Sequence, residues 1–217
     1  MIATPNVHRI FAALALLGIL VVVPSRAAGS AADAHLLAGA KHFRDGRFAE
    51  ALVEFRVAER LGAEGEVVWY TAAALLKLGR AEDAVENFLR AQEVASGVGD
   101  SLLEYYRAMA MYEARLYLSA DRILGRLAAE VGPRIAEQVR EVRGRVATAL
   151  SSVPDTAVID WYLERAQRAV REGRGRLAKA YVDEAQALSS RRQDRYRSAD
   201  LAAMELRARS AGEGRTR

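Results

Sequence analysis

The sequence predicts an all-α protein, a right-handed α-solenoid of stacked helical hairpins with about ten helices after an N-terminal signal peptide. One helix pattern occurs twice in register: "GRFAEALVEFRVAERLG" at residue 46 is followed 33 residues later by "GRAEDAVENFLRAQEVA". The chain has only four prolines in 217 residues, so long stretches are free to be helical. A single hairpin cannot bury its own apolar stripe, and stacking makes the core continuous.

The N-terminal residues have the pattern of a secretory signal peptide. A lone arginine in residues 1–9 precedes an uninterrupted apolar run of 14 residues, Ile10–Val23, and small residues that suit a peptidase follow. The run is shorter than the roughly 20 residues that a helix needs to cross a membrane. We therefore expect a signal peptide over residues 1–28 and an exported protein, periplasmic or extracellular. An uncleaved anchor in the inner membrane is the alternative.

Each copy of the repeated pattern is predicted to be one hairpin. Spacings of four and three residues place Ala51, Phe55 and Ala58 on one face of a helix. A second apolar-periodic stretch lies upstream of each copy, and Gly46 and Gly79 mark the helix stops between the two stretches. The unit is therefore a pair of antiparallel helices joined at a glycine.

This pattern resembles the tetratricopeptide repeat, which has a small residue in its first helix, a turn glycine, and an alanine followed four residues later by an aromatic residue. The resemblance divides residues 34–132 into three repeats. The third repeat is degenerate, because Arg115 replaces the turn glycine and Leu124 replaces the phenylalanine. A fourth hairpin is expected over residues 156–189, with Gly173 at its turn.

The remaining segments lie outside the repeat pattern. Residues 133–152 start at a proline that suits the opening of a helix and carry one apolar stripe, so we expect an extra amphipathic helix there. Residues 191–210 carry a weaker stripe and are expected to form a capping helix with one polar face. Residues 211–217 are predicted to be a disordered tail.

The residue types argue against catalysis. The chain has no cysteine, which excludes disulfides and thiolate metal sites. Neither a G-x-S-x-G nor a P-loop pattern occurs. His35 and His42 lie seven residues apart without a fixed acid beside them, and we expect His42 in the aromatic slot of a terminal repeat and His35 partly exposed. We therefore predict no catalytic residue, no metal and no cofactor.

Charge is unevenly placed along the chain. Residues 35–133 hold 12 basic and 15 acidic side chains, whereas residues 134–217 hold 18 basic and 12 acidic ones. A basic C-terminal half could dock on an acidic partner or on anionic lipid. The alternative is that its arginines solvate helix faces in pairs four residues apart. For an exported chain we expect no nucleic-acid partner.

In tetratricopeptide repeats the first helices line a concave groove, and the resemblance places seven side chains of this chain there. Trp and Tyr are common anchors of interfaces. The alternative is that Trp69 or Tyr105 packs between neighbouring repeats. Chaperone-binding members carry Lys and Asn where this chain has apolar residues such as Leu36 and Ala40, so an apolar or mixed ligand segment is favoured. The predicted groove residues are Phe43, Arg44, Trp69, Lys77, Tyr105, Met109 and Tyr112.

Two functions remain open at this point. The first is an exported, non-enzymatic scaffold that binds a protein or peptide segment in its groove. The second is a structural subunit of a bacterial envelope assembly, of the secretion, pilus or motility type. It would be anchored by an uncleaved Ile10–Val23 and would dock through the basic C-terminal half.

Overall fold

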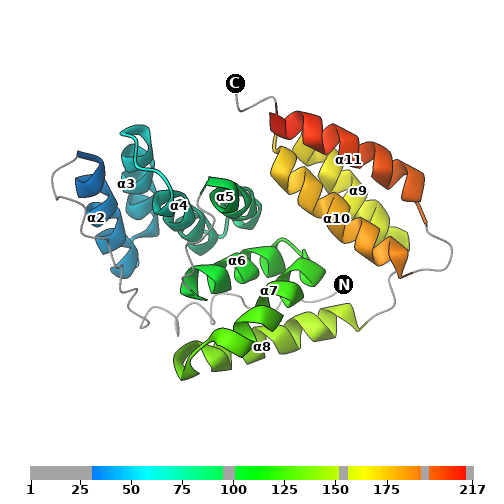
Figure 1. The fold of residues 1–217 in the computed structure, drawn as a ribbon, viewed down its shortest axis with the longest axis horizontal. Helices are drawn as coiled ribbons and strands as arrows, with labels where there is room; N and C mark the ends of the chain where they lie inside the picture. Colours follow the sequence, from blue (N-terminus) through cyan, green and yellow to red (C-terminus); the bar gives the residue numbers. More distant parts are fainter. Residues whose placement is uncertain (1–30, 95–100, 152–155, 192–195, 214–217) are drawn as a thin grey trace.

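The computed structural model describes residues 31–94, 101–151, 156–191 and 196–213. Within these ranges the chain forms ten α-helices and no strand, and successive helices pack on each other from α2 to α8 and again from α9 to α11 (Figure 1). The predicted all-α, solenoid-like fold is thereby confirmed. The expected signal peptide lies outside the described residues. No helix within them is long and apolar enough to span a bilayer.

Three helical hairpins come first, followed by one single helix and a layer of three helices. Helix α8 begins at Pro133, and α11 continues to Glu213, so that residues 211–213, expected in the tail, are helical. Residues 214–217 lie outside the described ranges. The helices are α2 (Ala31–Arg44), α3 (Phe48–Arg60), α4 (Glu66–Lys77), α5 (Ala81–Val94), α6 (Ser101–Glu113), α7 (Tyr117–Glu130), α8 (Pro133–Leu150), α9 (Thr156–Arg171), α10 (Gly175–Ser190) and α11 (Ser198–Glu213).

The repeated residues of α3 and α5 form the centre of the core. Phe55 and Phe88, with the alanines around them in the repeat, are fully buried. The ring of Phe55 stacks on Tyr70 of the next hairpin, with 5.7 Å between ring centroids. A Cβ atom at Gly39 of α2 would lie 2.6 Å from the Phe55 ring, so a small residue is required where these two helices meet.

The hairpin turns share one backbone conformation. Gly46, Gly79 and Gly173 have φ of 76°, 73° and 68° at their turns, and Arg115 has φ of 64° at the equivalent place between α6 and α7. An L-residue with a side chain is strained in this left-handed region, whereas glycine is not. The degenerate third repeat therefore keeps the turn geometry of the others, although it lacks the glycine.

The fourth hairpin turns back against the earlier repeats. Helices α9, α10 and α11 form a layer of their own, with α10 on the side that faces α5 and α7 (Figure 1). The main contacts of α9 are with α10 and α11. The C-terminal layer thus covers the second helices of the second and third hairpins, and this arrangement creates the clefts described below.

Candidate functional site

Four of the seven predicted groove residues lie in the hydrophobic core, which corrects the expectation that they project into an open groove. Phe43, Trp69, Tyr105 and Met109 are 7%, 2%, 1% and 4% exposed. Trp69 packs edge-on against Phe88, with 5.6 Å between ring centroids. For Trp69 the physical reason is that α4 is covered on all sides: its ten consecutive residues from 67 to 76, apolar except for Thr71, are all buried. Helix α6, which carries Tyr105 and Met109, is buried over most of its length in the same way.

The other three predicted groove residues lie nearer the surface. Arg44 is exposed, whereas Lys77 and Tyr112 are half-buried. The ammonium group of Lys77 lies 4.9 Å from the centroid of the Tyr106 ring. Burial lowers the pKa of Lys77 to about 8, against the opposing effect of the Glu113 charge. Burial also raises the pKa of Glu113 to about 7, and the charge of Lys77 opposes this shift.

The raised pKa of Glu113 predicts a pH dependence of stability. Between about pH 4.5 and 7 the folded chain holds a proton that the unfolded chain releases, so the free energy of unfolding falls as the pH rises through this window. Glu113→Gln should flatten the slope, since the amide does not titrate. Urea unfolding of the wild type and of the variant across this pH range measures the slope of the unfolding free energy. Parallel pH profiles for the two proteins would contradict the prediction.

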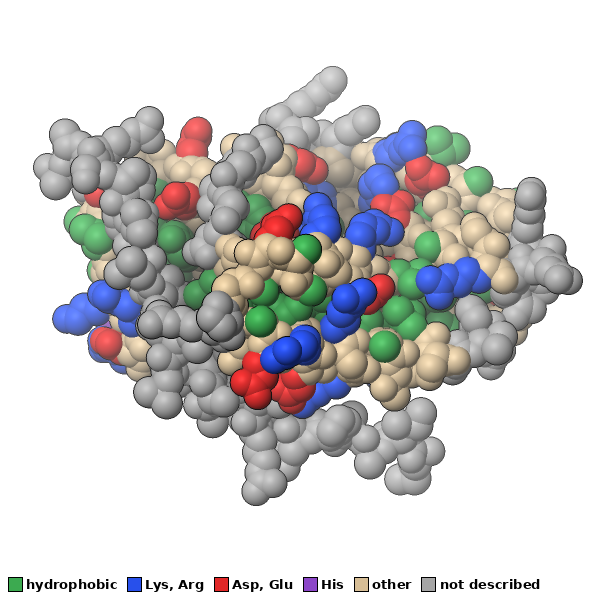
Figure 2. Space-filling view, turned by 60° about the horizontal axis from the view of Figure 1, so that its bottom comes forward, with side chains coloured by type: hydrophobic (Ala, Val, Ile, Leu, Met, Phe, Trp, Pro, Cys, Tyr) green, Lys and Arg blue, Asp and Glu red, His purple; other side chains and the backbone are tan. Residues whose placement is uncertain are grey.

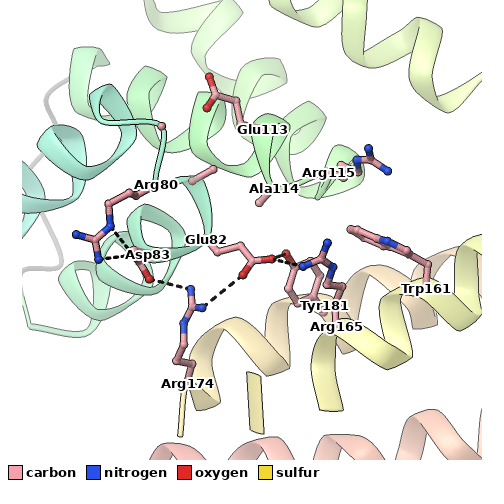
Figure 3. Close-up of a pocket in the computed structure, with 12 residues that line it drawn as sticks. Arg80, Glu82, Asp83, Glu113, Ala114, Arg115, Trp161, Arg165, Arg174 and Tyr181 are labelled. Carbon is pink, nitrogen blue, oxygen red and sulfur yellow. Dashed lines mark hydrogen bonds and ion pairs between the residues drawn. The ribbon is translucent and has the colours of Figure 1, made fainter. Parts of the chain in front are cut away.

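A polar cavity, lined in part by Glu113, lies where two repeat turns face the α9–α10 hairpin. Its volume is about 470 Å³. The walls are the turn and first residues of α5 (79–83), the turn after α6 (113–115), and four side chains of the C-terminal layer (Figure 3). We call this cavity the turn cleft. The four side chains are those of Trp161, Arg165, Arg174 and Tyr181.

Glu82 is the centre of the hydrogen-bond and ion-pair network in the turn cleft. Its carboxylate accepts a hydrogen bond of 2.8 Å from the Tyr181 hydroxyl and lies 3.3 Å from Arg165 and 3.4 Å from Arg174. Arg174 also pairs with Asp83 at 3.2 Å (Figure 3). Each acid of this network therefore already has a cationic partner within the chain.

Trp161 stands at one side of the cleft between two guanidinium groups. Arg165 lies 5.0 Å and Arg115 5.4 Å from the centroid of its ring. The Tyr162 hydroxyl donates a hydrogen bond to the main-chain carbonyl of Arg115, which fastens the strained turn to α9. Arg115 is exposed, and it forms no ion pair with any carboxylate in the described part of the chain. The Arg115 guanidinium at the rim of the turn cleft is therefore accessible to a carboxylate of another molecule.

Part of the basic C-terminal half is engaged inside the molecule. Arg176 pairs with Glu93 at 2.5 Å and with Glu86 at 3.5 Å, both on α5. Glu86 also accepts a hydrogen bond of 2.8 Å from the main-chain nitrogen of Leu177. Basic and acidic side chains are interspersed over the face in Figure 2. Some basic side chains of the C-terminal half therefore join it to α5 through ion pairs.

The two histidines of the first helix form no metal centre with their neighbours. His35 shares a hydrogen bond of 2.6 Å with Glu54 and is partly exposed, and His42 is half-buried. Among the described residues, no group of three or more His, Cys, Asp or Glu side chains could hold a metal ion.

No protein-family model matches the chain, and no curated protein matches it significantly. The geometry of the turn cleft and the repeat pattern are therefore the basis for a functional proposal. Sequence reasoning did not single out Trp161 and Arg165, because their partners in the cleft lie far away in the sequence: Arg165 is 83 residues from Glu82. The Arg115 substitution at a glycine position was the signal that could have drawn attention to this turn.

Proposed function

We propose that the chain is a non-enzymatic scaffold that binds a segment of another protein, and that the segment docks at the turn cleft. The observation that carries the proposal is the Trp161 ring, half-buried between Arg165 and Arg115 at the cleft wall. Tryptophan and arginine are the residue types most enriched at interface hot spots. A left-handed Arg115 also keeps backbone strain that glycine would relieve, and such strain clusters at functional sites.

The chemistry of the cleft favours a partner segment with an acidic side chain beside an aromatic or apolar one. Glu82 and Asp83 are already paired with arginines of the chain, whereas the Arg115 guanidinium lies against the Trp161 ring and pairs with no carboxylate of the described residues. A carboxylate could bind Arg115 in a bidentate geometry, and an apolar group could rest on the indole ring. The repeat resemblance supports the same class of function, and the pattern of residues 1–28 supports an exported location.

The proposal predicts that Trp161 and Arg115 dominate the affinity for the partner. The partner is first identified by crosslinked pull-down from native envelopes, and its affinity is then measured by calorimetry. Trp161→Ala should weaken binding by at least about 2 kcal/mol, as expected of a hot-spot anchor. Arg115→Gln should weaken it by about 1–3 kcal/mol through the lost charge-assisted hydrogen bonds.

The matched control is Arg168→Gln. Arg168 is an exposed arginine on the same helix as Trp161 and Arg165 but does not line the cleft, so its variant should bind like the wild type. Circular dichroism establishes that each variant is folded. If folded Trp161→Ala and Arg115→Gln variants keep full affinity, the turn cleft is not the binding site.

A further inference from the structure

A second cavity lies beside the α5–α10 contact. Its volume is about 390 Å³, and helices α5, α6, α7 and α10 form its walls. We call it the back cavity. It shares no lining residue with the turn cleft.

The wall that α6 provides contains a buried cation. The Arg107 side chain is only 5% exposed, and one of its terminal nitrogens donates a hydrogen bond to Glu104. Its Nε atom is buried and has no hydrogen-bond partner. Burial lowers the pKa of Arg107, and the positive charge of nearby Arg126 lowers it further. An unpaired donor on a buried guanidinium is costly, and an anion in the cavity would relieve that cost.

Two more arginines stand on the α7 wall of the same cavity. Arg122 and Arg126 are one helical turn apart, and both are exposed. Within the described residues, neither lies within ion-pair distance of a carboxylate. Glu104 partly balances the charge of Arg107, whereas Arg126, on the facing wall, carries a like charge that acts against it.

The acids on the opposite wall already have hydrogen-bond or ion-pair partners within the chain. The Glu184 carboxylate is buried and accepts hydrogen bonds from the main-chain nitrogens of Leu118 (2.5 Å) and Ser119 (3.2 Å) and from the Ser119 hydroxyl (2.9 Å). It thereby holds the start of α7 against α10. Asp183 pairs with Lys179 at 2.6 Å. The charged groups of the cavity that remain without an ion-pair partner among the described residues are therefore Arg122 and Arg126.

The rest of the lining is largely apolar. Leu89 comes from α5, Met111 from α6 and Ile123 from α7, and α10 adds two alanines; Gln92 of α5 is a polar exception. The volume falls within the range in which small-molecule sites occur. A bare inorganic anion would leave this apolar surface without a partner, whereas an anion joined to a compact apolar group would satisfy both parts of the cavity.

We propose that the back cavity binds a small carboxylate that carries a compact apolar group. The carboxylate lies between Arg107 and Arg126, and the apolar group rests against Leu89, Met111 and Ile123. Both the C-terminal residue of a peptide and a short fatty acid have this chemistry. The site is independent of the turn cleft and of the function proposed for it.

The test is calorimetric titration of the full chain with three probes. N-acetyl-leucine represents a peptide end, octanoate represents an acyl chain, and N-acetyl-leucinamide is the neutral control. At least one acid should bind saturably, and N-acetyl-leucine should bind about tenfold or more tightly than its amide if the peptide end is the source. Tighter binding of octanoate than of N-acetyl-leucine would identify the acyl chain as the better mimic.

Arg126→Gln should weaken binding of the acids by about tenfold, through loss of one charged hydrogen-bond donor. Arg126 is exposed, so this variant should stay folded. Arg140→Gln on α8 removes an exposed arginine that does not line the cavity, so it should leave the affinity for the acids unchanged. The proposal is overturned if neither acid binds at millimolar concentration. It is also overturned if Arg126→Gln binds the acids as tightly as the wild type.

Discussion

Replacing Phe88 with alanine is expected to lower the free energy of unfolding by about 3–5 kcal/mol. The ring is fully buried in α5 and packs against the indole of Trp69, so its removal leaves a cavity that rigid neighbouring helices cannot close. Chemical denaturation followed by circular dichroism measures the loss. Phe48→Ala is the control. Phe48 is half-buried beside a hairpin turn, so its replacement should lower the free energy of unfolding by less.

Trp69→Ala should destabilise the fold to a similar extent, by about 3–5 kcal/mol. This outcome is the opposite of what a groove residue would give, because a side chain in an open groove can be removed with little effect on the melting temperature. A Trp69→Ala variant that melts with the wild type would restore Trp69 as a surface anchor. A loss below about half a kcal/mol for Phe88→Ala would show that the repeat register itself is wrong.

Gly175→Ala is expected to displace α11 and to cost about 3 kcal/mol or more, as severe overpacking does. A Cβ atom at Gly175 would lie 2.2 Å from the main-chain nitrogen of Gly212 and 2.8 Å from the carbonyl oxygen of Ala208. Both obstacles are backbone atoms, so no side-chain rotation relieves the clash. Helix α11 buries Leu201 and Met204 against the layer, and this burial would be lost.

Amide hydrogen exchange reports the displacement directly, because α11 should lose protection before α3 and α5 do. Gly144→Ala on α8 is the matched control. A Cβ atom there meets nothing within 4 Å, so alanine should stabilise the helix by about 0.5–1 kcal/mol. Unchanged exchange in α11 of Gly175→Ala would mean that the two backbones do not approach as closely as described.

The candidate site could be predicted only in part. The exceptional position of Arg115 is visible in the sequence, because the other hairpins have glycine at the same turn. The partners that surround it are not, since Glu82 lies 83 residues from Arg165 and 99 residues from Tyr181. The composition shows that the two halves of the chain have net charges of opposite sign. It does not show that α5 and the start of α10 contact each other.

The sequence by itself determined the features that depend on neighbours three or four residues apart. The buried face of Phe55 and Phe88, the left-handed turns and the start of α8 at Pro133 all follow from local periodicity and backbone sterics. Tertiary structure alone decided that α10 folds back on α5 and α7. It also decided that Trp69 is core, because periodicity identifies the faces of a helix that are apolar, whereas only packing determines which of them another segment covers.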